Sequence, residues 1–176
     1  MAKKEDYWKI YHLTESWIKF ADTKAIAFLG IIGIILTIFI KNFKIFSELP
    51  ITNTIKLLSL ISVGLLIISV FFSILCLYPQ KSDKIEKNAF YYNAISHNFK
   101  QDSYGKYLDE LNEETFYNQL SVQIFQLASV CDKKYCYVEK SLKFFIWGGV
   151  VLFILLLCLY FNISFDLMGL LNFHFH

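Results

Sequence analysis

Three long apolar runs without a charged residue divide the chain, at residues 25–40, 57–78 and 144–165. The second and third hold 22 residues each. A helix rising about 1.5 Å per residue needs about 20 residues to cross roughly 30 Å of hydrocarbon. A soluble domain could not cover so much bunched apolar side chain, and 56% of the chain is hydrophobic. The pattern predicts a membrane protein with three spanning helices.

The first run is short, with 16 residues. Trp17, Phe20 and Ala21 extend it toward the N-terminus, where Lys19 and Lys24 can place their ammonium groups among the lipid headgroups. We therefore interpret residues 25–40 as the first span and residues 1–24 as an amphipathic helix that precedes it.

The lysines predict the orientation of the spans. All 17 basic residues are lysine, and only three of them lie in the loop at residues 41–56. The other fourteen lie before the first span or between residues 79 and 143. The positive-inside rule places these two segments in the cytoplasm. The 41–56 loop and an interfacial tail at residues 166–176 then lie outside.

Helical periodicity continues from the spans into the cytoplasmic segments. Thr14, Ile18, Ala21 and Ala25 recur on one face of a helix that leads into the first span. No Pro or Gly interrupts residues 5–24.

A second long helix is predicted before the third span. Asn112 is a favourable N-cap, and Glu113 and Glu114 complement the helix dipole in the first turn. An apolar stripe follows at helical spacing, which predicts one continuous helix over 113–165. The stripe contains Phe116, Leu120, Ile124, Leu127, Cys131, Tyr135, Val138 and Leu142.

The segment between residues 79 and 112 carries a weaker pattern. It holds an aromatic cluster and an expected short helix at 104–111, and no strand alternation. We expect an all-α membrane protein with three transmembrane helices. Its helical cytoplasmic domain is formed by the N-terminal segment and residues 79–143, which we interpret as the sensor.

Catalytic and metal-binding motifs are missing from the sequence. There is no GxSxG, HExxH, P-loop or Gly-rich dinucleotide turn. The four cysteines show no metal-ligand spacing. We expect neither an enzyme, nor a metal site, nor a cofactor. The absence of arginine means that an anion site would use lysine, hydroxyl groups, amides or helix N-termini.

Two polar segments flank the spans and are candidate functional sites. Asp22, Thr23 and Lys24 bring an acid, a hydroxyl and a base to the start of the first span. They form either an interfacial anchor, in which Asp22 offsets Lys19 and Lys24, or a gating site at the membrane boundary.

The second candidate lies before the third span. Lys133, Lys134 and Tyr135 are either a positive collar or a site for an anionic ligand, with Tyr91, Tyr92 or Tyr135 available to stack on a base.

The composition of the spans favours close helix packing. Small residues allow neighbouring helices to approach, and no charge lies within a span. Buried ionisable groups usually mark the path of a proton-coupled transporter or an ion filter. The sequence is still compatible with a simple pore or a membrane-disrupting assembly. Because three spans cannot enclose a pore in one chain, a pore requires a homo-oligomer. The small residues are Ala27, Gly30, Gly33, Ser59, Ser62, Ser69, Gly148 and Gly149.

The chain resembles the membrane effectors of the bacterial Pycsar antiphage systems over nearly its whole length. Asn93-Ala94 departs from the Gly-Asp that the family often has after the aromatic stretch. The resemblance is carried by Trp17, Phe20-Ala21-Asp22-Thr23-Lys24-Ala25, Leu77-Tyr78-Pro79, Phe90-Tyr91-Tyr92, Gln119, Gln123-Ile124, Leu127 and Lys133 to Tyr135.

This resemblance implies a defence protein that responds to a nucleotide second messenger, a cyclic mononucleotide or an oligonucleotide. A nucleotide cyclase or nucleotidyltransferase encoded nearby would make it. The implied activity is to oligomerise and permeabilise the bacterial inner membrane, which ends phage production by abortive infection. The resemblance adds Gln123 to the candidate ligand-binding residues.

The alternative is a passive membrane scaffold or accessory subunit that docks a soluble partner. The identity of the nucleotide, the sign of its control, the subunit number and the choice between a pore and general disruption stay open at this point.

Overall fold

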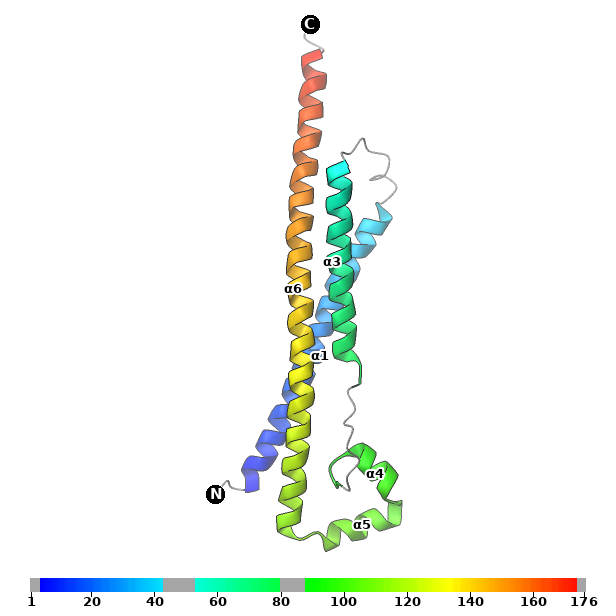
Figure 1. Cartoon of the computed structure of the whole chain (residues 1–176), viewed down its shortest axis with the longest axis vertical. Helices are drawn as coiled ribbons and strands as arrows, with labels where there is room; N and C mark the ends of the chain where they lie inside the picture. Colours follow the sequence, from blue (N-terminus) through cyan, green and yellow to red (C-terminus); the bar gives the residue numbers. More distant parts are fainter. Residues whose placement is uncertain (1–3, 43–52, 80–87, 174–176) are drawn as a thin grey trace. The chain divides into compact units, whose positions relative to one another are not determined.

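The computed structural model describes the backbone of residues 4–42, 53–79 and 88–173, and the side chains of 5–42, 53, 55–79, 88–91 and 94–161. All secondary structure in these ranges is helical (Figure 1). The predicted all-α class is therefore confirmed for the described residues. Most of the 41–56 loop lies outside them.

Three of the described helices are long and apolar enough to cross a membrane. They are α1 (Lys4–Lys41), α3 (Asn53–Leu77) and α6 (Glu113–Phe173). Both α1 and α6 run without a break between the predicted cytoplasmic segments and the predicted spans, as the periodicity indicated. The chain thus carries three candidate spans, as the apolar runs predicted.

The helix α6 ends later than predicted. It continues to Phe173 rather than stopping near residue 165. No proline follows Phe165, so nothing in the local sequence forces the backbone out of the helix. The part of the predicted interfacial tail that the structure describes is therefore helical. Its location at the membrane interface stays a prediction.

The chain divides into two compact units, each of which takes residues from all three long helices or their ends. We call Met1–Thr23 with Cys76–Cys136 the polar unit, and Lys24–Leu75 with Tyr137–His176 the apolar unit.

The polar unit adds two short helices, α4 (Tyr92–Asn98) and α5 (Gln101–Glu110). The short helix expected at 104–111 thus begins three residues earlier, at Gln101. The predicted N-cap of α6 is confirmed, because the Asn112 side-chain oxygen accepts a hydrogen bond from the Thr115 backbone N–H at 2.8 Å. An aromatic cluster of Trp8, Phe90 and Phe116 packs within this unit, with Phe90 and Phe116 centroids 4.9 Å apart.

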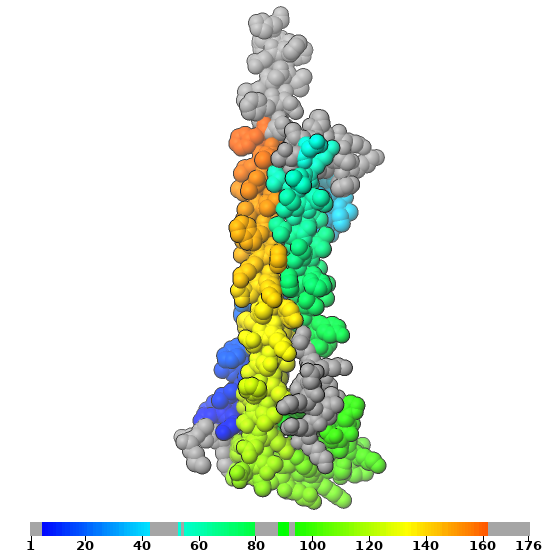
Figure 2. All heavy atoms as spheres, in the orientation of Figure 1, coloured from blue at the N-terminus to red at the C-terminus, as the bar shows by residue number. Residues whose placement is uncertain are grey.

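Small polar side chains hold α3 against α6 in the apolar unit. The Ser69 hydroxyl donates to the Ser141 carbonyl at 2.8 Å, and the Ser73 and Ser141 hydroxyls lie 2.7 Å apart. The Ser62 hydroxyl donates to the Gly148 carbonyl at 3.0 Å. Figure 2 shows these two helices in continuous contact. The prediction of close packing through small residues is confirmed at Ser62, Ser69 and Gly148.

Other small residues do not take part in this packing. A Cβ added at Gly30, Gly33 or Gly149 would meet nothing within 4 Å. Ser59 donates to the Lys56 carbonyl of its own helix.

The inward face of α6 differs in one respect from the predicted apolar stripe. Leu120, Cys131 and Val138 are buried as expected, whereas Leu142 is 38% exposed. Gln123, Lys134 and Ser141 are buried between them. The sequence pattern predicted that only apolar residues of α6 are buried. Polar groups are also buried where hydrogen-bond or ion-pair partners compensate their loss of hydration. The predicted face of α1 is confirmed, with Thr14, Ala21 and Ala25 buried and Ile18 half-buried.

Candidate functional site

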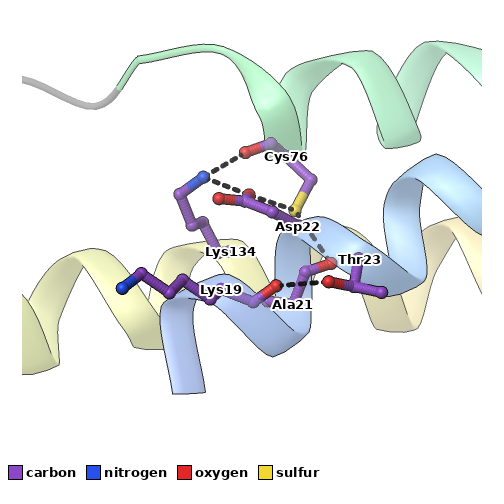
Figure 3. Close-up of polar contacts among 6 residues, drawn as sticks. All are labelled: Lys19, Ala21, Asp22, Thr23, Cys76 and Lys134. Carbon is purple, nitrogen blue, oxygen red and sulfur yellow. Dashed lines mark hydrogen bonds and ion pairs between the residues drawn. The ribbon is translucent and has the colours of Figure 1, made fainter. Parts of the chain in front are cut away.

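One ammonium group connects all three long helices within the polar unit. Lys134 of α6 forms an ion pair with Asp22 of α1 and donates a hydrogen bond to the Cys76 carbonyl of α3 at 2.8 Å (Figure 3). We call Asp22, Cys76 and Lys134 the ion-pair site. The Lys134 side chain is 8% exposed and that of Asp22 is 32% exposed.

The local structure explains why these groups meet. Cys76 lies in the last turn of α3, where backbone carbonyls have no partner inside the helix and a cation is favoured by the helix dipole. Lys134 lies on the inward face of α6, between the buried residues Cys131 and Val138. The Cys76 thiol lies 3.9 Å from the Ala21 carbonyl and 4.0 Å from the Asp22 carboxylate, so α3 and α1 also touch directly.

Burial of the Lys134 ammonium group in the ion-pair site costs free energy unless partners compensate it. A buried ammonium group loses its hydration and is tolerated only when a countercharge and hydrogen bonds replace it. Removing one partner of a buried pair costs about 3–5 kcal/mol, because the other charge stays buried and unpaired. Lys134 is thus a contact that α6 makes with both α1 and α3 in this unit, beside the ring contact between Trp8 of α1 and Phe116 of α6.

The structure separates the members of the first predicted site. Asp22 faces Lys134, whereas the exposed Thr23 hydroxyl donates to the Lys19 carbonyl of its own helix at 2.9 Å. Lys24 is half-buried and belongs to the apolar unit. The alternative, in which Asp22 offsets Lys19, is wrong for that pair, because Lys19 pairs with Glu15 at 2.7 Å.

The second predicted site is also divided. Lys134 is buried, but its neighbour Lys133 is exposed. Tyr135 lines a different hollow of about 360 Å³, together with Trp17, Cys131 and Asp132. The three residues therefore do not form one anion site. Tyr92 begins α4, and its side chain lies outside the described residues.

A cleft of about 390 Å³ opens within the polar unit between α1, residues 90–91 and α6. The helix α6 forms one wall of this cleft, and Lys134 lies at one end of that wall. The predicted residues Tyr91 and Gln123 also line the cleft. The lining residues are Tyr11, Glu15, Ile18, Phe90, Tyr91, Gln123, Gln126, Leu127, Val130 and Lys134.

Hydrogen bonds hold the short segment that carries Phe90 and Tyr91. The Gln119 side-chain oxygen accepts from the Ala89 N–H at 2.9 Å, and the Asn88 side chain donates to the Gln119 carbonyl at 3.2 Å. The Tyr104 hydroxyl donates to the Ala89 carbonyl at 2.8 Å. This segment therefore presents its aromatic rings from a defined position.

Two oxygen atoms of the cleft have no partner in the part of the chain that the structure describes. The side-chain carbonyl oxygens of Gln123 and Gln126 are buried and accept no hydrogen bond from a described residue. Gln123 is only 5% exposed. A buried acceptor without a donor costs about 1–3 kcal/mol, so unpaired oxygens in a cleft indicate a place where a ligand supplies N–H or O–H groups.

Sequence reasoning missed several residues of the site. Tyr11, Glu15, Phe90 and Gln126 line the cleft, and the Cys76 carbonyl accepts from Lys134. The polar residues on the buried face of α6 were a usable signal, because glutamine and lysine on such a face need partners. Among the described residues, no group of three or more His, Cys, Asp or Glu is placed to hold a metal ion.

The fold and the site define an all-helical membrane protein with a polar unit in which the buried Lys134 ammonium group joins three long helices. A family model, the Pycsar effector protein domain, matches residues 6–161. The chain is also 31% identical over 142 residues to the Pycsar effector protein SaPycTM of Staphylococcus aureus, an alignment covering 78% of this chain and 85% of that protein. No solved structure matches the chain. The chain therefore belongs to the Pycsar effector family, which acts in antiphage defence.

Proposed function

We propose that this effector is a nucleotide-gated, non-catalytic membrane protein that forms homo-oligomers and permeabilises the inner membrane. One observation carries the proposal: Lys134 belongs both to the ion-pair site and to the wall of the cleft. A ligand in the cleft can therefore act directly on the contact that holds α1, α3 and α6 together.

The gating step is a competition for one ammonium group. An anionic group of the ligand approaches Lys134 and replaces the Asp22 carboxylate as its countercharge. Asp22 is about one-third exposed and can be hydrated once it is released, whereas Lys134 needs a partner. Loss of the ion pair frees α1 from α6 at this point.

Continuous helices transmit the change. Both α1 and α6 run unbroken from the polar unit into the apolar unit. A tilt of either helix in the cytoplasm therefore moves its membrane half as one body. Large apolar side chains on the outside of the spans, such as Ile34 and Phe153, are available to lipid or to neighbouring copies. A nucleotide cyclase or nucleotidyltransferase encoded nearby would supply the ligand.

Dye release from liposomes tests this function. The purified chain is inserted into liposomes and titrated with cyclic mononucleotides, cyclic dinucleotides and short oligonucleotides. We expect one class of nucleotide to switch on leak, because only a phosphate-bearing ligand replaces Asp22 at Lys134. Protein-free liposomes with the same nucleotides are the control. No leak with any nucleotide, from protein shown to be folded and inserted, would favour the scaffold or accessory subunit.

The proposed orientation places the N-terminus and the polar unit in the cytoplasm. Cys136 is exposed, whereas Cys76 and Cys131 are buried, so Cys136 is a natural reporter. A membrane-impermeant maleimide is expected to label the chain in inverted vesicles but not in intact spheroplasts. A Cys136→Ser variant should lose the signal in inverted vesicles. Strong labelling of Cys136 from outside intact spheroplasts would reverse the proposed topology.

A further inference from the structure

We infer that the end of the cleft at Gln123 and Gln126 binds the N–H edge of a nucleobase that carries an exocyclic amino group. We call this part of the cleft the acceptor end. The inference rests on the proposed function, because it assigns the base-reading part of the ligand site.

Two buried oxygens make the acceptor end selective for donors. The Gln123 and Gln126 side-chain oxygens lack partners among the described residues, and both residues line the cleft. They lie three residues apart on α6 and so share one face of the helix. A ligand that presents two N–H groups satisfies both oxygens, whereas a ligand carbonyl placed there would leave them unpaired and repelled.

Aromatic rings suit the same ligand. Tyr11, Phe90 and Tyr91 line the cleft from α1 and from the segment fastened to Gln119. Aromatic side chains stack on the planar ring of any nucleobase. The rings therefore select a base, and the glutamines select among bases. Adenine, cytosine and guanine offer an amino group with two N–H donors, whereas uracil offers a single ring N–H.

The position of positive charge in the cleft determines how the ligand is oriented. Among the described residues that line the cleft, Lys134 is the only cation, and it lies eight residues beyond Gln126 along α6. Eight residues of helix span about 12 Å, a length that a nucleotide can bridge. The base thus lies at the acceptor end and the phosphate points toward Lys134. A nucleoside without phosphate fills the acceptor end and leaves the Asp22–Lys134 pair intact.

Isothermal titration of the full chain in detergent micelles tests the base preference. The probes are adenosine, cytidine, guanosine, uridine and inorganic phosphate. We expect at least one amino-bearing nucleoside to bind roughly tenfold or more tightly than uridine, the effect of one buried acceptor left unpaired. The same nucleoside should suppress leak caused by its nucleotide, because it occupies the cleft without reaching Lys134. Uridine binding as tight as that of every amino-bearing nucleoside, or phosphate binding as tight as that of the nucleosides, would overturn the inference.

Variants assign the preference to the two glutamines. Gln123→Met and Gln126→Met keep the side-chain length but remove the oxygen, and they should reduce the preference over uridine to nearly nothing. Gln101→Met is the matched control, because Gln101 is exposed on α5 outside the cleft. The Gln101→Met protein should keep the base preference of the unsubstituted chain. Base preference that persists in both cleft variants would also overturn the inference.

The two proposals fail in different ways. Nucleotide-triggered leak without any base preference would leave the gated effector standing and reject the acceptor end. A base preference lost in the glutamine variants, with no nucleotide-triggered leak, would support the acceptor end and reject the gating.

Discussion

Replacement of Asp22 with alanine is expected to make leak independent of nucleotide and to lower the free energy of unfolding by about 3–5 kcal/mol. The variant leaves the Lys134 ammonium group buried, with the Cys76 carbonyl as its one remaining partner among the described residues. The ion pair that the ligand is proposed to break is then already absent. The two readouts are dye release with and without nucleotide, and denaturant unfolding in detergent micelles.

Removal of the other partner should have a smaller effect on stability. Lys134→Met leaves the Asp22 carboxylate, which is about one-third exposed and can be hydrated. Combining Asp22→Ala with Lys134→Met removes both charges and is expected to recover most of the stability lost in Asp22→Ala.

An exposed pair on α6 supplies the control. Glu139→Ala breaks a 2.7 Å pair with Lys143 in which both side chains are about two-thirds exposed, and such pairs contribute only about 0.3–0.5 kcal/mol. Asp22→Ala would contradict the role of the ion-pair site if it were no more destabilising than Glu139→Ala. So would leak that still required nucleotide.

Gly148→Leu is expected to separate α3 from α6 and to destabilise the apolar unit by about 1–3 kcal/mol or more. A Cβ at Gly148 would lie 3.1 Å from the Leu66 Cδ2 atom and 3.4 Å from the Leu65 Cβ atom. Leu66 is 1% exposed, so its side chain has little space in which to move. Separation would also break the Ser62–Gly148 hydrogen bond. The effect is measured as the shift of the unfolding midpoint in detergent micelles.

The next residue provides a matched comparison. A Cβ at Gly149 meets nothing within 4 Å, so Gly149→Leu makes the same chemical change without a clash. Leucine is also the better helix former, and Gly149→Leu should be neutral or slightly stabilising. Equal unfolding midpoints for the two variants would show that close packing at Gly148 does not hold α3 against α6.

Several features of the fold were predictable because their causes are local. The absence of charge over 57–78 and 144–165 is a property of the chain alone, and it predicts spans whatever packs around them. The N-cap at Asn112 acts within four residues, and the face of α1 follows from spacing along one helix. The length of α6 was less predictable, because no residue after Phe165 breaks the helix.

The candidate site was only partly predictable. Asp22, Tyr91, Gln123 and Lys134 were singled out, but their partners were not, since Asp22 and Lys134 are 112 residues apart in the chain. Lys133 and Lys134 look alike in sequence, yet one is exposed and the other buried. Neighbouring residues on a helix point about 100° apart, so the rotation of α6 about its own axis decides which lysine meets Asp22.

The sequence by itself determined the three candidate spans, the all-helical class and the family, because runs of apolar residues and short motifs act through properties of a single segment. The tertiary structure decided that Lys134 joins α1, α3 and α6, and that Gln123 and Gln126 leave two oxygens unpaired in a cleft. Those features depend on which groups from distant segments meet when they leave water. Burial makes both a matched charge and an unmatched acceptor energetically significant, and burial exists only in the folded chain.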